Sequence, residues 1–279
     1  MALASGRAAS LLALVSLVSV VGFLAGPAAA TGKTGQVTVF WGRNKAEGTL
    51  REACDTGRYT IVIISFLNVF GHGKYSLDLS GHPIAGIGDD IKHCQSKGIL
   101  VFLSIGGFGN QYSLPTSQSA TDFADYLWNA YFLGNASGVH RPFGDAFVDG
   151  LDFFIEQGSP DHYDEFARRL WDYNKGYRAR TPVQLSATPR CKYPDRRVER
   201  VLATGHVTRI NVRFYGDPYC AAYWQLEWQT VGYVHPKNLY YGVIPVVQKA
   251  DNYGGVMIWD RYADKRTNYS SYAVEWAAA

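Results

Sequence analysis

Charge of either sign is scarce in this chain of 279 residues: 27 Lys and Arg face 24 Asp and Glu, and charged residues make up only 18%. So small an imbalance excludes a charged disordered chain and a basic tail of the kind that binds nucleic acid. No linker rich in Pro, Ser or Gly divides the sequence, and its 47% of hydrophobic residues are enough for a large core. We therefore expect one domain and no nucleic-acid partner.

Clusters of metal-ligating residues are missing as well. The four cysteines, Cys54, Cys94, Cys191 and Cys220, form no Cys-x-x-Cys pair, and the seven histidines include no His-Glu-x-x-His. Zinc sites are built from residues at such close spacing. We expect neither a metal ion nor another cofactor.

Long apolar runs are confined to the first 30 residues. Arg7 gives this segment a positive start, residues 11–24 are apolar, and Ala28-Ala29-Ala30 fits a small-residue cleavage site. This order is typical of a secretory signal peptide, and the run is too short to span a bilayer. We predict a signal peptide at 1–30, a mature domain at 31–279, and a secreted, extracellular protein without a membrane partner.

Secretion changes how the cysteines are interpreted. In an oxidising compartment they are expected to form two disulfides, for which three connectivities exist. Pairing of nearest neighbours, Cys54 with Cys94 and Cys191 with Cys220, is the connectivity that we favour.

Two sequons for N-glycosylation are present. They are Asn135-Ala-Ser137 and Asn268-Tyr-Ser270. Either can accept a glycan in a secreted protein, so both are candidate modification sites.

Strand and helix signals alternate along the chain. The expected strands are 36–42, 60–70, 99–107, 146–156, 184–189, 210–215 and 255–260, and the expected helices are 45–56, 84–97, 119–132, 162–173, 195–203 and 237–249. This alternation favours an α/β fold, a (β/α)8 TIM-type barrel first and a doubly wound sheet second. Seven strands are clear rather than eight, and residues 230–234 offer only a stub for the missing one.

The most informative stretch is Asp149-Gly-Leu-Asp152-Phe-Phe154-Ile-Glu156. Because side chains alternate along a strand, Asp152, Phe154 and Glu156 share one face. Acids that point inward at the carboxyl end of a barrel strand indicate a catalytic site. A solvated strand end is the alternative, but the apolar surroundings favour the site.

This stretch resembles the Asp-x-x-Asp-x-Asp-x-Glu signature of glycoside hydrolase family 18. Leu103-Ser-Ile-Gly-Gly107 and Gly255-Val-Met-Ile-Trp-Asp260 are similar to two further strands of that family, and the likeness extends over the mature chain. The sequence is most similar to plant class III chitinases and, among them, to the cereal xylanase inhibitor proteins. Residues 37–44, 90–97 and 251–255 carry this narrower resemblance.

The resemblance implies that Glu156 occupies the position of the general acid. In active members the Asp two residues earlier stabilises the substrate acetamide, which attacks the anomeric carbon in place of a protein nucleophile. This chain has Phe154 there, which can neither accept a hydrogen bond nor balance a developing positive charge. We therefore expect a chitinase-like protein that is not an enzyme, with Asp152 and Glu156 as vestiges.

Arg213 adds a second departure from the family, since chitinases tend to carry Gln there. Asn211, Arg213 and Tyr215 alternate on one face of their strand, and we expect that face to point inward. Arg213 would then pair with Glu156 and hold it ionised, which removes a general acid. The alternative is an outward Arg213 in contact with solvent.

Basic residues gather in the second half of the chain. Residues 168–213 contain twelve Lys and Arg against three acids. Solvated helix faces or a basic surface that attracts an acidic partner would both explain this excess.

The resemblance gives that basic surface a partner. The inhibitor family blocks microbial family 11 xylanases through a basic loop after the fourth barrel helix, and the matching loop here is 174–181. Lys175, Arg178 and Arg180 are the candidate inhibitory residues, while Gly176 aligns with the Arg that is characteristic of the inhibitors. A projecting cation can pair with the catalytic acids of a glycosidase cleft.

The resemblance also implies a truncation around the seventh barrel strand. Relative to the family, roughly twenty residues are absent between Glu227 and Val234. They include the loop that is used against family 10 xylanases, so we expect that inhibitory face to be lost.

The sequence thus predicts a monomeric, secreted inhibitor of microbial endo-1,4-β-xylanases, most clearly of family 11, that acts in the plant apoplast in defence. An active class III chitinase and a protein that only binds or stores chitin oligosaccharide are the alternatives. For the last of these, Trp41, Tyr215 and Trp259 are candidates to stack on a sugar, although core packing explains such aromatics equally well.

Overall fold

The computed structural model describes residues 35–176, 182–215, 239–247 and 249–277. Several sequence predictions lie outside these ranges: the signal peptide at 1–30, Arg178, Arg180, Cys220 and the stub at 230–234.

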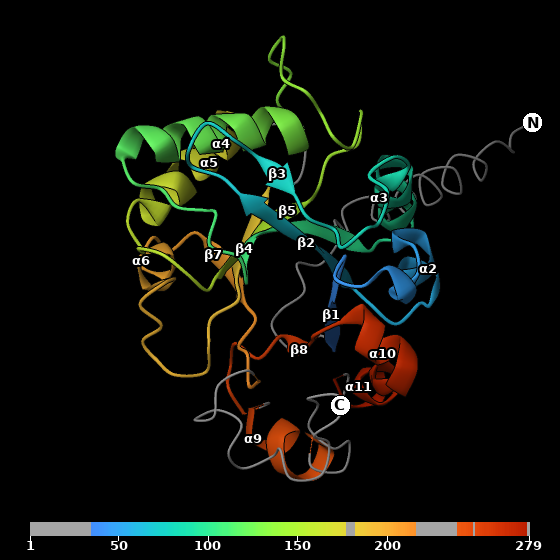
Figure 1. Ribbon diagram of the computed structural model, residues 1–279. Helices are drawn as coiled ribbons and strands as arrows, with labels where there is room; N and C mark the ends of the chain where they lie inside the picture. The colour runs from blue at the N-terminus through green and yellow to red at the C-terminus, as the bar shows by residue number, and fades with distance from the viewer. Residues whose placement is uncertain (1–34, 177–181, 216–238, 248, 278–279) are drawn as a thin grey trace, which may run out of the picture.

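The core of the fold is a curled sheet of parallel strands (Figure 1). Its order is β7-β6-β5-β4-β2-β1-β8, and the two-residue strand β3 pairs antiparallel with β2. Within the described residues β7 and β8 are the two ends of this order, so the sheet forms a partial barrel. The predicted fold, a (β/α)8-type barrel that is truncated, is confirmed. The strands are β1 (Gln36–Trp41), β2 (Ile61–Val69), β3 (Ser76–Leu77), β4 (Leu100–Gly107), β5 (Gly150–Ile155), β6 (Gln184–Ala187), β7 (Val207–Ile210) and β8 (Gly255–Ile258).

Helices cover the outside of the sheet, and α4 and α5 lie side by side (Figure 1). Side-chain caps fix where several helices begin: Thr49 accepts from Glu52 N, Thr116 from Ser119 N, and Asp260 from Ala263 N. The helices are η2 (Lys45–Glu47), α2 (Leu50–Asp55), α3 (Ile87–Ser96), α4 (Ser117–Tyr131), α5 (Tyr163–Gly176), α6 (Glu199–Leu202), η3 (Leu239–Val243), α9 (Ile244–Val247), α10 (Arg261–Thr267) and α11 (Tyr269–Ala277).

The strand predicted at 210–215 is wrong in its bounds, because β7 begins at Val207 and ends at Ile210. The next residues nevertheless stay extended beside β6: Asn211 N donates to Ala187 O at 2.8 Å and Arg213 N donates to Pro189 O at 2.9 Å. The alternation of side chains therefore continues through 215 in the predicted phase. The two C-terminal helices, α10 and α11, were not among the predicted helices.

Two hydrophobic clusters divide the core. The larger lies between the sheet and the helices, and the smaller consists of inward-facing side chains of the strands. Inward residues of alternate strands filling a barrel in layers are typical of this architecture. The inner cluster is formed by Phe40, Ile61, Ile63, Phe66, Phe102 and Phe154, with Leu100, Met257 and Trp259 packed against it.

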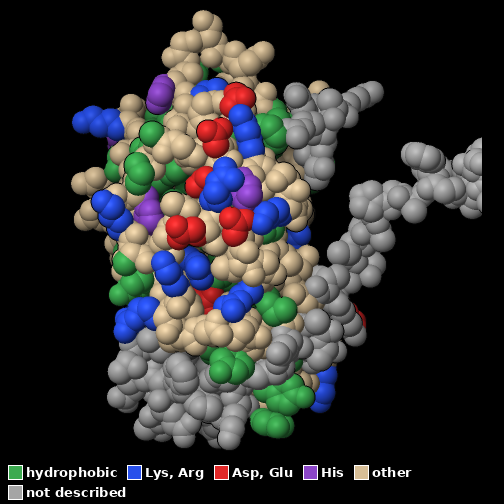
Figure 2. All heavy atoms as spheres, turned by 90° about the vertical axis from the view of Figure 1, so that its right-hand side faces the viewer, with side chains coloured by type: hydrophobic (Ala, Val, Ile, Leu, Met, Phe, Trp, Pro, Cys, Tyr) green, Lys and Arg blue, Asp and Glu red, His purple; other side chains and the backbone are tan. Residues whose placement is uncertain are grey.

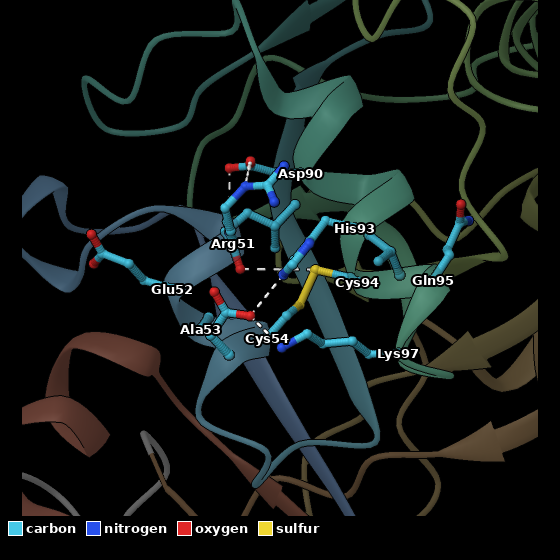
Figure 3. Close-up of a disulfide and its surroundings, with 12 residues drawn as sticks. Arg51, Glu52, Ala53, Cys54, Asp90, His93, Cys94, Gln95 and Lys97 are labelled. Carbon is cyan, nitrogen blue, oxygen red and sulfur yellow. Dashed lines mark hydrogen bonds and ion pairs between the residues drawn. A yellow bond between two sulfur atoms is a disulfide. The ribbon is translucent and has the colours of Figure 1, made fainter.

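A disulfide joins α2 to α3 (Figure 3). It links Cys54 to Cys94, which confirms the first half of the favoured connectivity. Cys191 is disulfide-bonded as well, while Cys220, its predicted partner, lies outside the described residues. A bridge between two buried cysteines accords with an oxidising compartment.

The face formed around α2 and α3 carries basic and acidic side chains close together (Figure 2). Ion pairs join many of them: Arg51 to Asp90 at 3.0 Å, His93 to Asp55 at 2.7 Å, and Lys97 to Asp55. Charge on this face is therefore locally balanced. Among the described helices, none is long and apolar enough to cross a membrane.

Candidate functional site

Strand β5 directs Asp152, Phe154 and Glu156 toward the interior of the sheet, as the alternation predicts. All three side chains are buried, with Asp152 and Phe154 fully enclosed. Asp152 accepts hydrogen bonds at 2.8 Å from each of Ser104 Oγ, Ser186 Oγ and Thr188 Oγ1. Burial raises the pKa of Asp152, and these hydroxyl donors oppose that rise.

Glu156 is held between two arginines. Its Oε1 forms an ion pair with Arg213 Nη1, and its Oε2 forms an ion pair and hydrogen bond with Arg190 Nη2. Burial alone would raise the pKa of Glu156, but the hydrogen bond from Arg190 and the charge of Arg213 together hold it below its usual value. The contact expected between Glu156 and Arg213 is thus present, and Arg213 points inward rather than to solvent.

Phe154 lies at the centre of an aromatic cluster. Its ring centroid is 5.7 Å from that of Phe40, 5.0 Å from Phe66, 5.5 Å from Phe108 and 5.4 Å from Trp259. The guanidinium carbon of Arg213 lies 4.3 Å from the same centroid. The volume around the Phe154 ring is therefore filled by other aromatic rings and by the guanidinium of Arg213.

The glycines at the end of β4 allow this close packing. Gly107 has a φ of +87°, and a Cβ there would meet the Phe66 ring at 2.5 Å. A Cβ on Gly106, at φ +100°, would meet Phe154 O at 2.3 Å. Only glycine combines this backbone conformation with so near an approach.

Arg190 is the site residue that the sequence analysis missed. Ser186, Thr188 and Arg190 are alternate residues that continue the inward face of β6, and Arg190 forms a parallel bridge with Arg213. Extending the alternation past the end of the strand would have revealed Arg190 as a second partner of Glu156.

The site as a whole is poorly suited to general acid catalysis. A general acid must carry a proton at the working pH, and two arginines hold Glu156 in the ionised form. The neighbouring inward position, Phe154, offers no oxygen to a developing positive charge. Within the described part of the chain, no group of three or more His, Cys, Asp or Glu is placed to hold a metal ion.

The three aromatic residues considered for sugar stacking differ in exposure. Trp41 is 1% exposed and its Nε1 donates to Gly48 O at 2.9 Å, so its ring is a core residue and this prediction is corrected. Trp259 and Tyr215 are half-buried, with ring centroids 6.1 Å apart. Phe108, which was not predicted, is 57% exposed and packs edge-on to Trp259 at 5.4 Å.

The candidate inhibitory residue Lys175 lies at the end of α5. It is exposed and forms an ion pair with Asp172 at 2.7 Å. Glu156 follows the carboxyl end of β5. Helix α5 then returns the chain to the amino end of the sheet, where Gln184, the first residue of β6, pairs with Gly150, the first residue of β5. Lys175 and Glu156 thus lie at opposite ends of the parallel sheet, and the surface around Lys175 is separate from the site around Glu156.

Many cations of the basic stretch 168–213 are paired with acids outside it. Arg169 contacts Asp125 at 3.0 Å and Arg168 contacts Asp164 at 2.7 Å. Arg200 contacts Asp161 at 3.0 Å. Solvated, ion-paired helix faces therefore account for part of the excess charge.

Both sequon asparagines are exposed. Asn135 lines a cavity of about 520 Å³ that follows α4 and includes Arg141. Asn268 caps the end of α10, where its side chain contacts Arg58 and donates to Ser271 Oγ at 3.1 Å.

Comparisons with known proteins agree with this geometry. Residues 36–218 match the model of Glycosyl hydrolases family 18. The chain is 55% identical to xylanase inhibitor protein 1 of Oryza sativa subsp. japonica, covering 98% of this chain and 99% of that protein. It is 54% identical to xylanase inhibitor protein 1 of Triticum aestivum, covering 96% and 97%.

A solved structure is similar over most of its length. It is the complex of a xylanase–α-amylase inhibitor protein with trehalose, at a TM-score of 0.78 and 36% identity, covering 87% of this chain and 98% of that one. The alignment with the rice protein spans 304 positions, more than the 279 residues of this chain, so the rice protein contains residues that this chain lacks.

Proposed function

The chain belongs to family 18 of the glycosyl hydrolases, and we propose that within it this protein is a secreted, catalytically silent inhibitor of microbial family 11 endo-1,4-β-xylanases. It acts as a monomer in the plant apoplast as part of defence. The observation that carries the proposal is the pairing of Glu156 with Arg190 and Arg213 on a chain so similar to xylanase inhibitor proteins.

Catalytic silence follows from three features of one face. Two cations keep Glu156 ionised, Phe154 stands where the resemblance places the acetamide-stabilising Asp, and apolar side chains rather than oxygen atoms surround Phe154. Loss of transition-state stabilisation of this kind typically costs several kcal/mol in activation free energy. Chitin hydrolysis is therefore not the activity of this protein.

Inhibition is assigned to the basic loop that follows α5. Lys175 is exposed at the end of α5, and the sequence places two further cations, Arg178 and Arg180, within the next five residues. A cation inserted into a cleft can pair with catalytic carboxylates in a desolvated setting, where charge-assisted hydrogen bonds are strongest. Because Lys175 lies at the other end of the sheet from Glu156, inhibition does not need the vestigial site.

The test is titration of a family 11 endo-xylanase with the purified mature protein. Stoichiometric inhibition by a cooperatively folded sample is the expected result. A folded sample that leaves the xylanase fully active contradicts the proposal.

Binding of chitin oligosaccharide is a second candidate, favoured by the exposed ring of Phe108 beside Trp259. Aromatic rings at strand ends can stack on the apolar face of a sugar. Calorimetric titration with chitin oligomers separates the candidates: saturable binding without turnover and without any effect on xylanases would favour this role over inhibition.

A further inference from the structure

One face of α5 leads from Lys175 back to an aromatic ring. Arg168, Trp171 and Lys175 are three and four residues apart, so their side chains follow one another along that face of the helix. Trp171 is half-buried, while Arg168 and Lys175 are exposed. The surface around Lys175 therefore contains an aromatic ring as well as charges.

The imidazole of His206 stacks on this ring. The two ring centroids are 4.8 Å apart, and the ring planes are inclined by only 10°. His206 directly precedes β7, whose first residue, Val207, pairs with Leu185 near the start of β6. The stack therefore lies at the amino end of the sheet, as Lys175 does, and away from Glu156.

The charges on this part of α5 cancel one another. Arg168 is paired with Asp164 at 2.7 Å, and Lys175 is paired with Asp172 at 2.7 Å. Each ion pair joins one cation to one acid, so these four side chains together have no net charge. Protonation of His206 therefore decides whether this face is positive.

The surroundings of His206 favour its neutral form in the free protein. Burial and the charges of Lys175 and Arg168 lower the pKa of His206, and Asp172 opposes them. At pH 7 the imidazole is therefore uncharged.

The charged groups of the elements on either side of His206 are engaged elsewhere or lie at the far end of their helix. On α6, Arg200 is paired with Asp161 at 3.0 Å, and Glu199 is exposed in the first turn. On β7, Arg209 donates to the side-chain oxygen of a glutamine in β6 at 3.3 Å. The charges of α5 thus dominate the environment of the imidazole.

An acidic cleft beside Lys175 would favour the charged form of His206 instead. Glycoside hydrolases act with a pair of carboxyl groups, so the cleft of such an enzyme carries negative charge. A carboxylate within about 4–6 Å of an imidazole stabilises the protonated form. The protonated imidazole would also be a cation on the face of the Trp171 ring, a contact that itself stabilises the charge.

We propose that the surface that binds the family 11 xylanase extends from Lys175 to the stacked pair of Trp171 and His206, and that His206 pairs as a cation with a carboxylate of the enzyme. This inference rests on the proposed inhibitor function and adds a regulation to it. Binding transfers a proton from the solvent to the imidazole, so inhibition is stronger in acid than at neutral pH.

The test is inhibition of a family 11 endo-xylanase between pH 5 and pH 8, with calorimetry at pH 6 in buffers of different ionisation enthalpy to count the protons taken up. Relative to the unmodified protein, His206→Gln should weaken inhibition about fivefold at pH 5 and less than about twofold at pH 8, and it should take up fewer protons. His206→Arg keeps a permanent cation on the Trp171 ring and should inhibit about fivefold more strongly than His206→Gln at both pH values. The same enzyme is used throughout, so its own titration cancels between variants.

His72→Gln is the matched control, at an exposed histidine between β2 and β3 at the other end of the sheet, and should change neither quantity. An unchanged proton count in His206→Gln, in a sample that still inhibits, overturns the inference and leaves the proposed function standing. Equal inhibition by His206→Arg and His206→Gln overturns it as well. No inhibition at any pH by a folded sample removes the proposed function and the inference together. Thermal unfolding of each variant shows that a loss of inhibition is not a loss of fold.

Discussion

Arg213 and Phe154 are in direct contact: the guanidinium carbon of Arg213 lies 4.3 Å from the ring centroid of Phe154. Both side chains also lie beside Glu156, so the three residues form one unit. The ring offers its face to a buried cation, a contact that is worth up to about 2 kcal/mol when desolvated. Nη1 of the same guanidinium pairs with Glu156, so Arg213 contacts Phe154 and Glu156 at once.

Placing a carboxylate at position 154 is not expected to give the protein chitinase activity. Phe154→Asp leaves Arg190 and Arg213 on Glu156, so the acid stays ionised, and the new carboxylate would itself pair with Arg213. Hydrolysis of chitin oligomers should remain at background, and the variant should lose about 3 kcal/mol of unfolding free energy with its buried ring.

The control is Phe154→Leu, which keeps an apolar side chain at the centre of the cluster and tests for folding. Combining Phe154→Asp with Arg190→Gln and Arg213→Gln frees Glu156 and is the variant in which turnover could first appear. Robust turnover from Phe154→Asp alone would show that the arginines do not silence Glu156.

Removing the charge of Glu156 should destabilise the protein at neutral pH. Glu156→Gln leaves two cations, of which Arg213 is buried, without a counter-charge, which costs about 3 kcal/mol of unfolding free energy. Chemical denaturation at pH 7 measures the loss. Glu52→Gln, on the exposed side of α2, is the control and should change stability by less than about 0.5 kcal/mol.

The same ion pair makes stability depend on pH in a defined direction. The pKa of Glu156 is lower in the folded protein than its value of 4.5 in the unfolded chain. Its contribution to the free energy of unfolding is therefore fully present above pH 4.5 and is lost as the pH falls through the pKa of the folded state. The difference in unfolding free energy between the unmodified protein and Glu156→Gln should therefore shrink below pH 4.5. A difference that stays constant between pH 7 and pH 3 would argue against an ionised Glu156.

The basic loop should act through charge. Replacing Lys175, Arg178 and Arg180 together by Ala is expected to raise the inhibition constant for a family 11 xylanase at least about tenfold, or about 1.4 kcal/mol. The affinity of the triple variant for the xylanase should depend less on salt concentration, because the ion pairs that salt would screen are no longer formed. Lys92→Ala, on the balanced face, is the control. Equal inhibition by the triple variant and the control would place the inhibitory surface elsewhere.

The disulfide between α2 and α3 should contribute strongly to stability. It closes a stretch with a sequence separation of 40, for which chain entropy alone predicts about 4 kcal/mol. Replacing Cys54 and Cys94 by Ser should lower the unfolding free energy by roughly this amount in denaturant. Xylanase inhibition by the folded fraction should persist, because Lys175 is on another helix.

Local pattern was enough to predict the parts of the fold where periodicity is strong. Alternation placed Asp152, Phe154, Glu156 and Arg213 on inward faces, and nearest-neighbour pairing found the first disulfide. Such features depend on the direction of each side chain, which the two-residue period of a strand sets.

Features that depend on tertiary packing were not predicted. Arg190 lies beyond the end of β6 and reaches Glu156 only because β5 and β6 are neighbours. In sequence, Trp41 looks like any aromatic residue that could stack on a sugar, but in the fold it is buried, with its Nε1 donating to Gly48 O and its ring 4.4 Å from that of His82. Helices α10 and α11 are short, and their existence depends on caps and on contacts with β1 rather than on a long amphipathic pattern.

The central claim is that this chain retains a family 18 scaffold for inhibition and not for hydrolysis. The most direct measurement is the residual activity of a family 11 endo-xylanase during titration with the mature protein, run beside a chitin-oligomer hydrolysis assay on the same folded sample. The account predicts that inhibition is complete at one inhibitor molecule per xylanase molecule and that chitin is not hydrolysed. Full xylanase activity at saturating protein, or measurable chitin hydrolysis, would contradict it.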